Sequence, residues 1–294
     1  MDKLFHGAIT ALVTPFKNNK VDEQSYRALI DSQIAQGIHG LVPCGSTGES
    51  ATLSHKEHEE VISICIDQVR GRVPVLAGSG SNNTSEAIAL TQYAKKAGAD
   101  GALLITPYYN KPTQEGLYQH YAAVARACDI PMILYNVPGR TGCNMLPPVL
   151  GRLARDFSNI IGVKEATGNL AQGSEVIEQC PEGFLVLSGD DFTALPLMAI
   201  GGAGVISVSS NLVPKKMAAM CDAFEAGKLA EAVALHHELF ALHKAMFIET
   251  NPVPVKKALE LMGQIQGQVR LPLVEMTEAH VEDLKKVLTS YKLI

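Results

Sequence analysis

The residue best suited to covalent chemistry is Lys164, which ends a short apolar run, Ile-Ile-Gly-Val. An ammonium group there is partly desolvated, and both desolvation and a nearby cation such as Arg140 favour the neutral amine. A neutral lysine amine adds to a ketone carbonyl and forms an imine. Loss of a proton from the neighbouring carbon then gives an enamine, which can attack an aldehyde. The alternative is a lysine that reaches from a strand end to water.

Several hydroxyl groups and one arginine are candidates for assisting this lysine. Tyr135 ends another apolar run, and a phenol can move protons during imine formation. Ser46, Thr47 and Tyr109 are the available hydroxyl partners. Arg140 follows a Pro-Gly pair and can bind a carboxylate through two parallel hydrogen bonds. Each residue also has an ordinary structural interpretation, as a packed strand-end hydroxyl or a solvated loop arginine.

The elements that must position these residues are short apolar runs that alternate with amphipathic stretches. Runs that are hydrophobic throughout are typical of parallel strands buried on both faces. The strands expected from them are Ala8–Val13, His39–Pro43, Val73–Ala77, Gly101–Ile105, Met132–Tyr135, Ile160–Lys164, Phe184–Ser188 and Gly204–Val208. Eight such units predict an α/β fold, a closed (β/α)8 TIM barrel, rather than an open sheet. The active site of such a barrel lies at the C-terminal ends of the strands.

Helices are indicated between these strands and throughout the C-terminal part of the chain. Asp22, Ser54 and Thr84 are the expected N-caps of three of them. The sequence after Val208 predicts only helices, at Pro214–Glu225, Leu229–Phe247, Pro254–Met262 and Glu278–Tyr291. We therefore assign residues 1–225 to the barrel and residues 226–294 to a C-terminal helical extension packed on it as part of one structural unit.

Composition excludes several classes of function. The 294 residues are 47% hydrophobic and 19% charged, which is enough for one large core, and the net charge of −5 gives no reason to expect nucleic acid or an anionic membrane as a partner. No apolar run approaches the ~20 residues needed to span a bilayer, and no signal-peptide core precedes the barrel, so we expect a cytoplasmic protein.

The six scattered cysteines form no CxxC pair, and no ligand set completes a site with His55 and His58. Neither a metal nor a cofactor is expected.

Six longer motifs stand in an order and spacing that resemble the dihydrodipicolinate synthase (4-hydroxy-tetrahydrodipicolinate synthase) family. They are GSTGESATL, TPYYNKPTQEGLYQHY, ILYNVPGRTG, IIGVKEATGN, LSGDD and GVISV. The similarity covers essentially the whole chain, including the segment ETNPVPVK in the helical tail. Such motifs in register are specific for pyruvate-dependent class I aldolases, and the turn PGRTG favours this family over its relatives.

The resemblance implies a lyase that condenses pyruvate with aspartate semialdehyde in diaminopimelate and lysine biosynthesis. Lys164 forms the imine with pyruvate in this family pattern, and Tyr135 relays protons with Ser46 and with Tyr109 from a neighbouring subunit. Many members carry threonine at the position of Ser46. Serine keeps the hydroxyl but loses the methyl that restricts χ1, so the relay is expected to be less pre-organised.

The resemblance also implies how the substrates are bound and how the chain assembles. Thr47 and the backbone of Ile206 position pyruvate, and Arg140 binds the carboxylate of aspartate semialdehyde and steadies the catalytic tyrosine. The implied assembly is a homotetramer built as a dimer of dimers.

A feedback site for L-lysine at a dimer interface is a further implication. Its matching positions here are Ser50, Ala51, His55, His58, Asn82, Glu86 and Tyr108. Glu86 would pair with the α-ammonium of the ligand, and His55 or His58 would hydrogen-bond with its ε-amine. We therefore expect L-lysine to inhibit the enzyme.

Two other functions agree with part of these observations. A sister aldolase, such as N-acetylneuraminate lyase or a 2-keto-3-deoxy-sugar-acid aldolase, shares the lysine and the tyrosine but binds polyhydroxylated substrates. Arg140 argues instead for a short aldehyde that bears a carboxylate. A non-catalytic barrel that senses a keto acid would use the lysine site, but it would leave the set of lysine, tyrosine and hydroxyl groups without a purpose.

Overall fold

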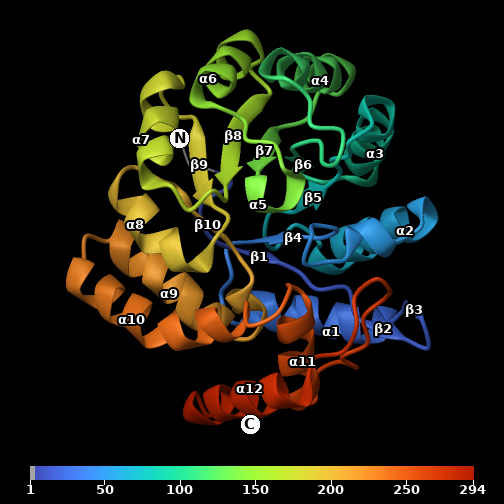
Figure 1. Ribbon diagram of the computed structural model, residues 1–294, viewed down its shortest axis with the longest axis vertical. Helices are drawn as coiled ribbons and strands as arrows, with labels where there is room; N and C mark the ends of the chain where they lie inside the picture. The colour runs from blue at the N-terminus through green and yellow to red at the C-terminus, as the bar shows by residue number, and fades with distance from the viewer. Residues whose placement is uncertain (1–3) are drawn as a thin grey trace.

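A computed structural model describes residues 4–294, in which eight parallel strands form a barrel surrounded by helices (Figure 1). The barrel strands are β1 (Gly7–Ala11), β4 (Gly40–Val42), β5 (Leu76–Gly78), β6 (Gly101–Ile105), β7 (Met132–Asn136), β8 (Ile160–Glu165), β9 (Leu185–Ser188) and β10 (Gly204–Ser207). Their hydrogen-bonded order is β4-β1-β10-β9-β8-β7-β6-β5. An isolated bridge between Leu41 and Val75 joins the two ends and closes the barrel. The predicted (β/α)8 TIM barrel is confirmed.

Eight helices follow the eight strands and cover the outside of the barrel. They are α1 (Glu23–Ala35), α2 (His55–Val69), α3 (Thr84–Ala97), α4 (Gln114–Ala127), α6 (Pro147–Asp156), α7 (Leu170–Gln179), α8 (Ala194–Ala199) and α9 (Pro214–Glu225). Asp22 and Ser54 cap α1 and α2 as predicted. The predicted cap Thr84 is wrong, because the side chain of Asn83 accepts the N–H of Ser85 and the Thr84 hydroxyl hydrogen-bonds with His120.

A short antiparallel hairpin, which the sequence patterns did not predict, follows the first barrel strand. Its strands are β2 (Phe16–Lys17) and β3 (Lys20–Val21). Asn18 and Asn19 between them have φ values of 52° and 60°. Asparagine tolerates this left-handed backbone, and two such residues form the tight turn that suits a two-residue hairpin.

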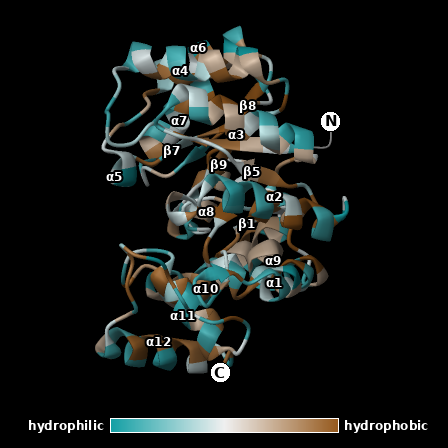
Figure 2. Ribbon diagram, turned by 90° about the vertical axis from the view of Figure 1, so that its right-hand side faces the viewer, coloured by the Kyte–Doolittle hydropathy of each residue, from teal (hydrophilic) through white to brown (hydrophobic). Residues whose placement is uncertain are grey.

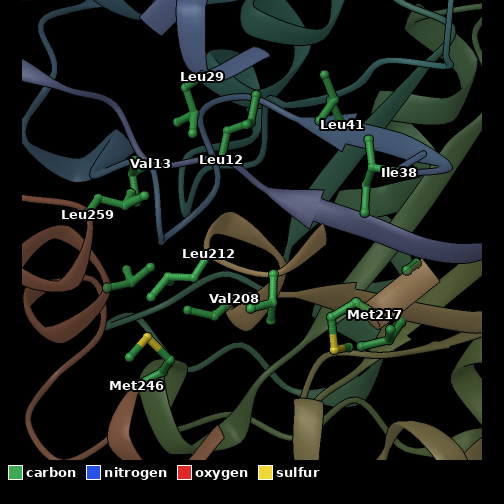
Figure 3. Close-up of a cluster of buried hydrophobic side chains, with 14 of the residues drawn as sticks. Leu12, Val13, Leu29, Ile38, Leu41, Val208, Leu212, Met217, Met246 and Leu259 are labelled. Carbon is green, nitrogen blue, oxygen red and sulfur yellow. The ribbon is translucent and has the colours of Figure 1, made fainter. Parts of the chain in front are cut away.

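The hydrophobic core has two parts, one inside the barrel and one between the strands and the helices. The inner part contains Ile9, Val42 and Ile206, all almost completely buried. The outer part includes the cluster in Figure 3, where Leu12 and Met217 are drawn among residues from both ends of the chain. Figure 2 shows the hydrophobic strands at the centre and hydrophilic stretches on the outer helices. Burial on both faces explains why the strand sequences are continuously apolar.

Three helices after α9 form the C-terminal part of the chain: α10 (Leu229–Ala245), α11 (Val253–Leu261) and α12 (Glu278–Ser290). Helix α10 packs against α9, and α12 lies on α10 and α11 at the edge of the molecule (Figure 1). Within residues 4–294, no helix combines the length and the apolar character required to cross a membrane.

Candidate active site

Lys164 lies at the carboxyl end of β8, where it is 6% exposed. In the sheet it pairs with Tyr135 of β7 on one side and with Leu187 of β9 on the other. Burial lowers the pKa of Lys164 to about 7; the Arg140 cation acts in the same direction and the Asp191 carboxylate in the opposite one. A large fraction of the amine is therefore neutral near pH 7, the state that adds to a carbonyl.

Tyr135 presents its ring to this amine. The Lys164 Nζ lies 4.2 Å from the centre of the Tyr135 ring. Burial raises the pKa of the Tyr135 phenol, while a hydrogen bond with Ser46 acts in the opposite direction. The backbone N–H and the hydroxyl of Thr106 both donate to the Tyr135 carbonyl, at 2.8 and 2.7 Å, and fix the end of β7. A protonated phenol beside a neutral amine is suited to moving a proton during carbonyl addition.

Asn251, on the segment between α10 and α11, connects two of the predicted binding residues. Its Nδ2 donates to the Thr47 hydroxyl at 3.0 Å, and its carbonyl accepts a hydrogen bond from Arg140 Nη2 at 3.0 Å. Thr47 is buried, whereas Arg140 is exposed on the short helix α5 (Pro138–Thr141). The patterns did not single out Asn251; its only signal was its place in the quoted segment ETNPVPVK.

A cavity of about 250 Å³ brings these groups together. Its polar lining includes Lys164, Tyr135, Ser46, Thr47, Arg140, Asp190 and Asn251, and its apolar lining includes Val137, Ala166, Val208, Phe192 and Phe247. Ile206 does not line this cavity; its side chain is buried in the inner core, and in the sheet it pairs with Ile9 of β1. The two phenylalanines and Asp190 were not identified as site residues from the sequence, because no spacing rule connects loops that lie far apart in the chain.

Gly189, at the end of β9, allows this strand to approach the lysine closely. A Cβ at this position would lie 2.6 Å from the Ala166 Cβ and 3.0 Å from the Lys164 Cε. Any larger residue would therefore push the lysine stem away from its present path. The sequence motif LSGDD places this glycine at the strand end.

Tyr109 does not belong to the lining of this cavity. It is 89% exposed, and its φ of 70° is unusual for a residue with a side chain. An aromatic side chain held outward in this backbone conformation is available to contact another molecule.

A second cavity, of about 450 Å³, lies next to the first. Six of the seven residues predicted for a lysine site line it: Ser50, Ala51, His55, His58, Glu86 and Tyr108. Asn82 does not line it, but its side chain donates to the Tyr108 carbonyl. Ser46, Arg140 and Asn251 line both cavities, so the two spaces share a wall.

His55, His58 and Glu86 of this second cavity already have partners within the chain. His55 Nε2 lies 2.5 Å from a Glu86 oxygen, and the Ser81 hydroxyl donates to the other oxygen, which lowers the pKa of Glu86. His58 Nε2 lies 2.7 Å from the Gly78 carbonyl, so this nitrogen must be the protonated one. Burial lowers the pKa of His58, so its ring is neutral. An amine ligand would thus compete with His55 for the Glu86 carboxylate.

Metal ligation is not indicated by the arrangement of side chains. Across residues 4–294, no group of three or more His, Cys, Asp or Glu side chains is placed to hold a metal ion.

The chain is similar to known proteins in both sequence and structure. The model of the dihydrodipicolinate synthetase family matches residues 4–291. The 4-hydroxy-tetrahydrodipicolinate synthase of Nitratidesulfovibrio vulgaris (strain Miyazaki F) is 63% identical over 97% of this chain and 98% of its own. The chloride-inhibited dihydrodipicolinate synthase of Acinetobacter baumannii, solved with pyruvate, is 46% identical, with a TM-score of 0.96 over 98% of this chain and 99% of its own. The enzyme of Cyanidioschyzon merolae, solved with lysine bound, is 40% identical, with a TM-score of 0.96 over 99% of both chains.

Proposed function

The chain belongs to the dihydrodipicolinate synthetase family and is a lyase of the class I aldolase type, and we propose how its residues carry out the reaction. The substrates are pyruvate and L-aspartate 4-semialdehyde, and the product is 4-hydroxy-tetrahydrodipicolinate, an intermediate of diaminopimelate and lysine biosynthesis. The observation that carries the proposal is the buried amine of Lys164, with its pKa lowered to about 7, beside the Tyr135 ring.

The first step is formation of an imine between Lys164 and pyruvate. The Nζ lone pair attacks the C2 carbonyl, and the Tyr135 phenol donates a proton to the developing alkoxide. Transfer of a second proton lets the C2 hydroxyl leave as water, which gives the iminium cation. Thr47 and the backbone of Ile206 hold the pyruvate carboxylate, and Ser46 returns protons to Tyr135 through its hydrogen bond.

The second step forms the new carbon–carbon bond. The iminium acidifies the pyruvate methyl group, and loss of one proton gives an enamine. The enamine attacks the aldehyde carbon of aspartate semialdehyde, whose carboxylate is bound by Arg140, and the resulting alkoxide takes up the proton that the methyl group lost, through the Tyr135 phenol. The amino group of the second substrate then attacks the iminium carbon, closes a six-membered ring and releases Lys164 as a free amine.

The residues proposed to bind the aldehyde favour a short aldehyde over the substrate of a sugar-acid aldolase. Arg140 donates a hydrogen bond to the Asn251 carbonyl, and both residues line a small cavity that Phe192 and Phe247 also line. Aromatic rings offer no hydrogen bonds to the hydroxyl groups of a sugar chain, and leaving those groups unpaired is costly. A short aldehyde with one carboxylate fits this lining.

Regulation, assembly and location are parts of the same proposal. We propose L-lysine as a feedback inhibitor, supported by the cavity around Glu86 and His55 and by the lysine-bound C. merolae enzyme. A homotetramer, a dimer of dimers, agrees with the outward position of Tyr109. The six cysteines are all unpaired, as is usual in a reducing compartment such as the cytoplasm.

A substrate assay tests the function. Purified enzyme is given pyruvate with either aspartate semialdehyde or N-acetylmannosamine, and product formation is followed with increasing L-lysine. Turnover is expected only with aspartate semialdehyde, and it should fall as lysine enters the millimolar range. Turnover of the sugar alone contradicts the assigned substrate, and activity unaffected by lysine contradicts the feedback site.

A further inference from the structure

Asp191 is a buried carboxylate behind the active-site cavity. It is 1% exposed, and its neighbours in the chain, Asp190 and Phe192, line the cavity. The Asp191 Oδ2 accepts the backbone N–H groups of Val208 and Ser209, both at 3.0 Å. Its Oδ1 has no hydrogen-bond partner among the described residues. A buried carboxylate with an unpaired oxygen is costly unless a positive charge compensates it.

The backbone brings Asp191 close to the lysine. In the sheet, β9 pairs with β8 so that Leu187 lies beside Lys164. Gly189, just beyond β9, approaches the lysine stem, since a Cβ on this glycine would lie 3.0 Å from the Lys164 Cε. Asp191 follows two residues later and is held by the end of the adjacent strand, β10, through Val208.

Formation of the imine places a positive charge in this cavity. The neutral amine of Lys164, a residue that is 6% exposed, becomes an iminium, which carries a positive charge. Arg140, which also lines the cavity, repels this cation. The other ionisable groups around Lys164 are the Tyr135 phenol and the carboxylates of Asp190 and Asp191.

Asp190 and Asp191 differ in their burial and in their hydrogen bonds. Asp190 is only half-buried, and its Oδ1 accepts the Phe192 N–H. Burial raises the pKa of Asp190, which favours its neutral form. Asp191 is more deeply buried, and one of its oxygens accepts two backbone N–H groups.

We infer that Asp191 is the counter-charge of the iminium formed on Lys164, and that it acts as a positioning residue through the lysine rather than by touching substrate. This inference rests on the proposed imine chemistry. A fixed charge placed where positive charge develops lowers the free energy of the charged intermediate without further reorganisation.

His243 of α10 completes the surroundings of this carboxylate. It is fully buried, its Nδ1 lies 2.8 Å from the Ser209 hydroxyl, and its ring meets the edge of Phe192 at 6.1 Å. Burial lowers the pKa of His243, while the neighbouring Asp191 carboxylate acts in the opposite direction, and the His243 Nε2 has no hydrogen-bond partner among the described residues. Replacing His243 leaves the Asp191 carboxylate in place, so this position offers a matched control within the same cluster.

The dependence on pH distinguishes a counter-charge from a packing role. Above the Lys164 pKa of about 7, imine formation converts a neutral amine into a cation, and loss of the Asp191 charge should weaken it. Below that pKa, the ammonium already carries the charge that the iminium keeps, so the same loss should have little effect. A structural defect would weaken imine formation equally at both pH values.

The test uses Asp191→Asn, whose side-chain carbonyl can still accept the Val208 and Ser209 N–H groups. Pyruvate is titrated against the intact enzyme, the imine is trapped with borohydride, and adduct yield gives the apparent dissociation constant. At about pH 8.5 we expect this constant to rise on the order of tenfold, and at about pH 6 less than about threefold. His243→Gln should show no such dependence on pH, and Asp191→Ser serves if the asparagine variant does not fold.

Three results would overturn the inference. One is an equal loss for Asp191→Asn at both pH values. Another is the same pH-dependent loss in His243→Gln, and the third is this loss in Asp190→Asn but not in Asp191→Asn. Failure of the proposed function looks different, because wild-type enzyme would then form no trapped adduct at either pH.

Discussion

At the scale of single residues, the active site keeps a lysine in a place that disfavours its charged form. The Lys164 pKa is about 7, against 10.5 for an unperturbed lysine, because the amine is buried. Between these values the unfolded chain binds a proton that the folded chain does not. The free energy of unfolding therefore rises with pH through this window, and below it the folded state bears the full cost of a buried ammonium.

This reasoning predicts a stability gain when the lysine is removed. Lys164→Met has a similar shape and no charge, so its free energy of unfolding at pH 7 should exceed that of the wild type by on the order of 4 kcal/mol. The gain should shrink as the pH approaches 10. Urea unfolding at several pH values measures this difference. A variant no more stable than the wild type at pH 7 would show that the amine bears no such cost.

The residues that the sequence could identify are those at strand ends. Lys164, Tyr135 and Ser46 were predicted because strand-end positions in a barrel converge on one mouth. Asn251 and Asp191 were not singled out by residue type or spacing. Asn251 meets Thr47 across 204 positions of the chain, and the importance of Asp191 depends on which of its oxygens lacks a partner. Neither property has a local sequence signal.

At the scale of elements, strand and helix order was predictable, while the contacts of the C-terminal helices were not. Lys256 of α11 forms an ion pair with Glu49 at 2.5 Å, and both side chains are almost completely buried. Glu49 belongs to the loop that carries Ser46 and Thr47, and its second oxygen accepts the Arg270 N–H. Helix α11 thus holds the loop that carries Ser46 and Thr47 from outside the barrel. A glutamate and a lysine this far apart in sequence resemble ordinary surface residues until the fold brings them together.

The N-cap of α3 is a second feature that the local sequence could not determine. Asn83 and Thr84 are both good capping residues. Asn83 takes the role because the hydroxyl of Thr84 is engaged by His120 of α4. Local propensity left two equivalent choices, and a contact between helices decided between them.

At the scale of the whole molecule, the proposed assembly assigns Tyr109 to the active site of a partner subunit. One chain therefore contains an incomplete proton relay, with Lys164 and Tyr135 in one cavity and Tyr109 directed outward at 89% exposure. Activity should then depend on association between chains, which makes the assignment testable with mixed oligomers.

Mixing two inactive variants tests this assignment. Tyr109→Phe loses the relay hydroxyl and Lys164→Ala loses the nucleophile, so each alone should have little activity. In a mixed dimer, the site that retains Lys164 receives an intact Tyr109 from the other subunit. Equal amounts, dissociated and reassociated, should recover about a quarter of the wild-type activity, since half of the dimers are mixed and each has one complete site. No recovery, with mixed dimers shown by native mass spectrometry, would contradict the contribution in trans.

The central claim is that pyruvate becomes covalently attached to Lys164. Wild-type enzyme incubated with pyruvate and reduced with borohydride should carry one reduced pyruvate on the peptide that contains Lys164, as measured by peptide mass spectrometry. Lys164→Arg, which keeps a cationic side chain but cannot form this imine, should carry none. An unmodified Lys164 peptide, or an adduct found on another lysine instead, would contradict the account.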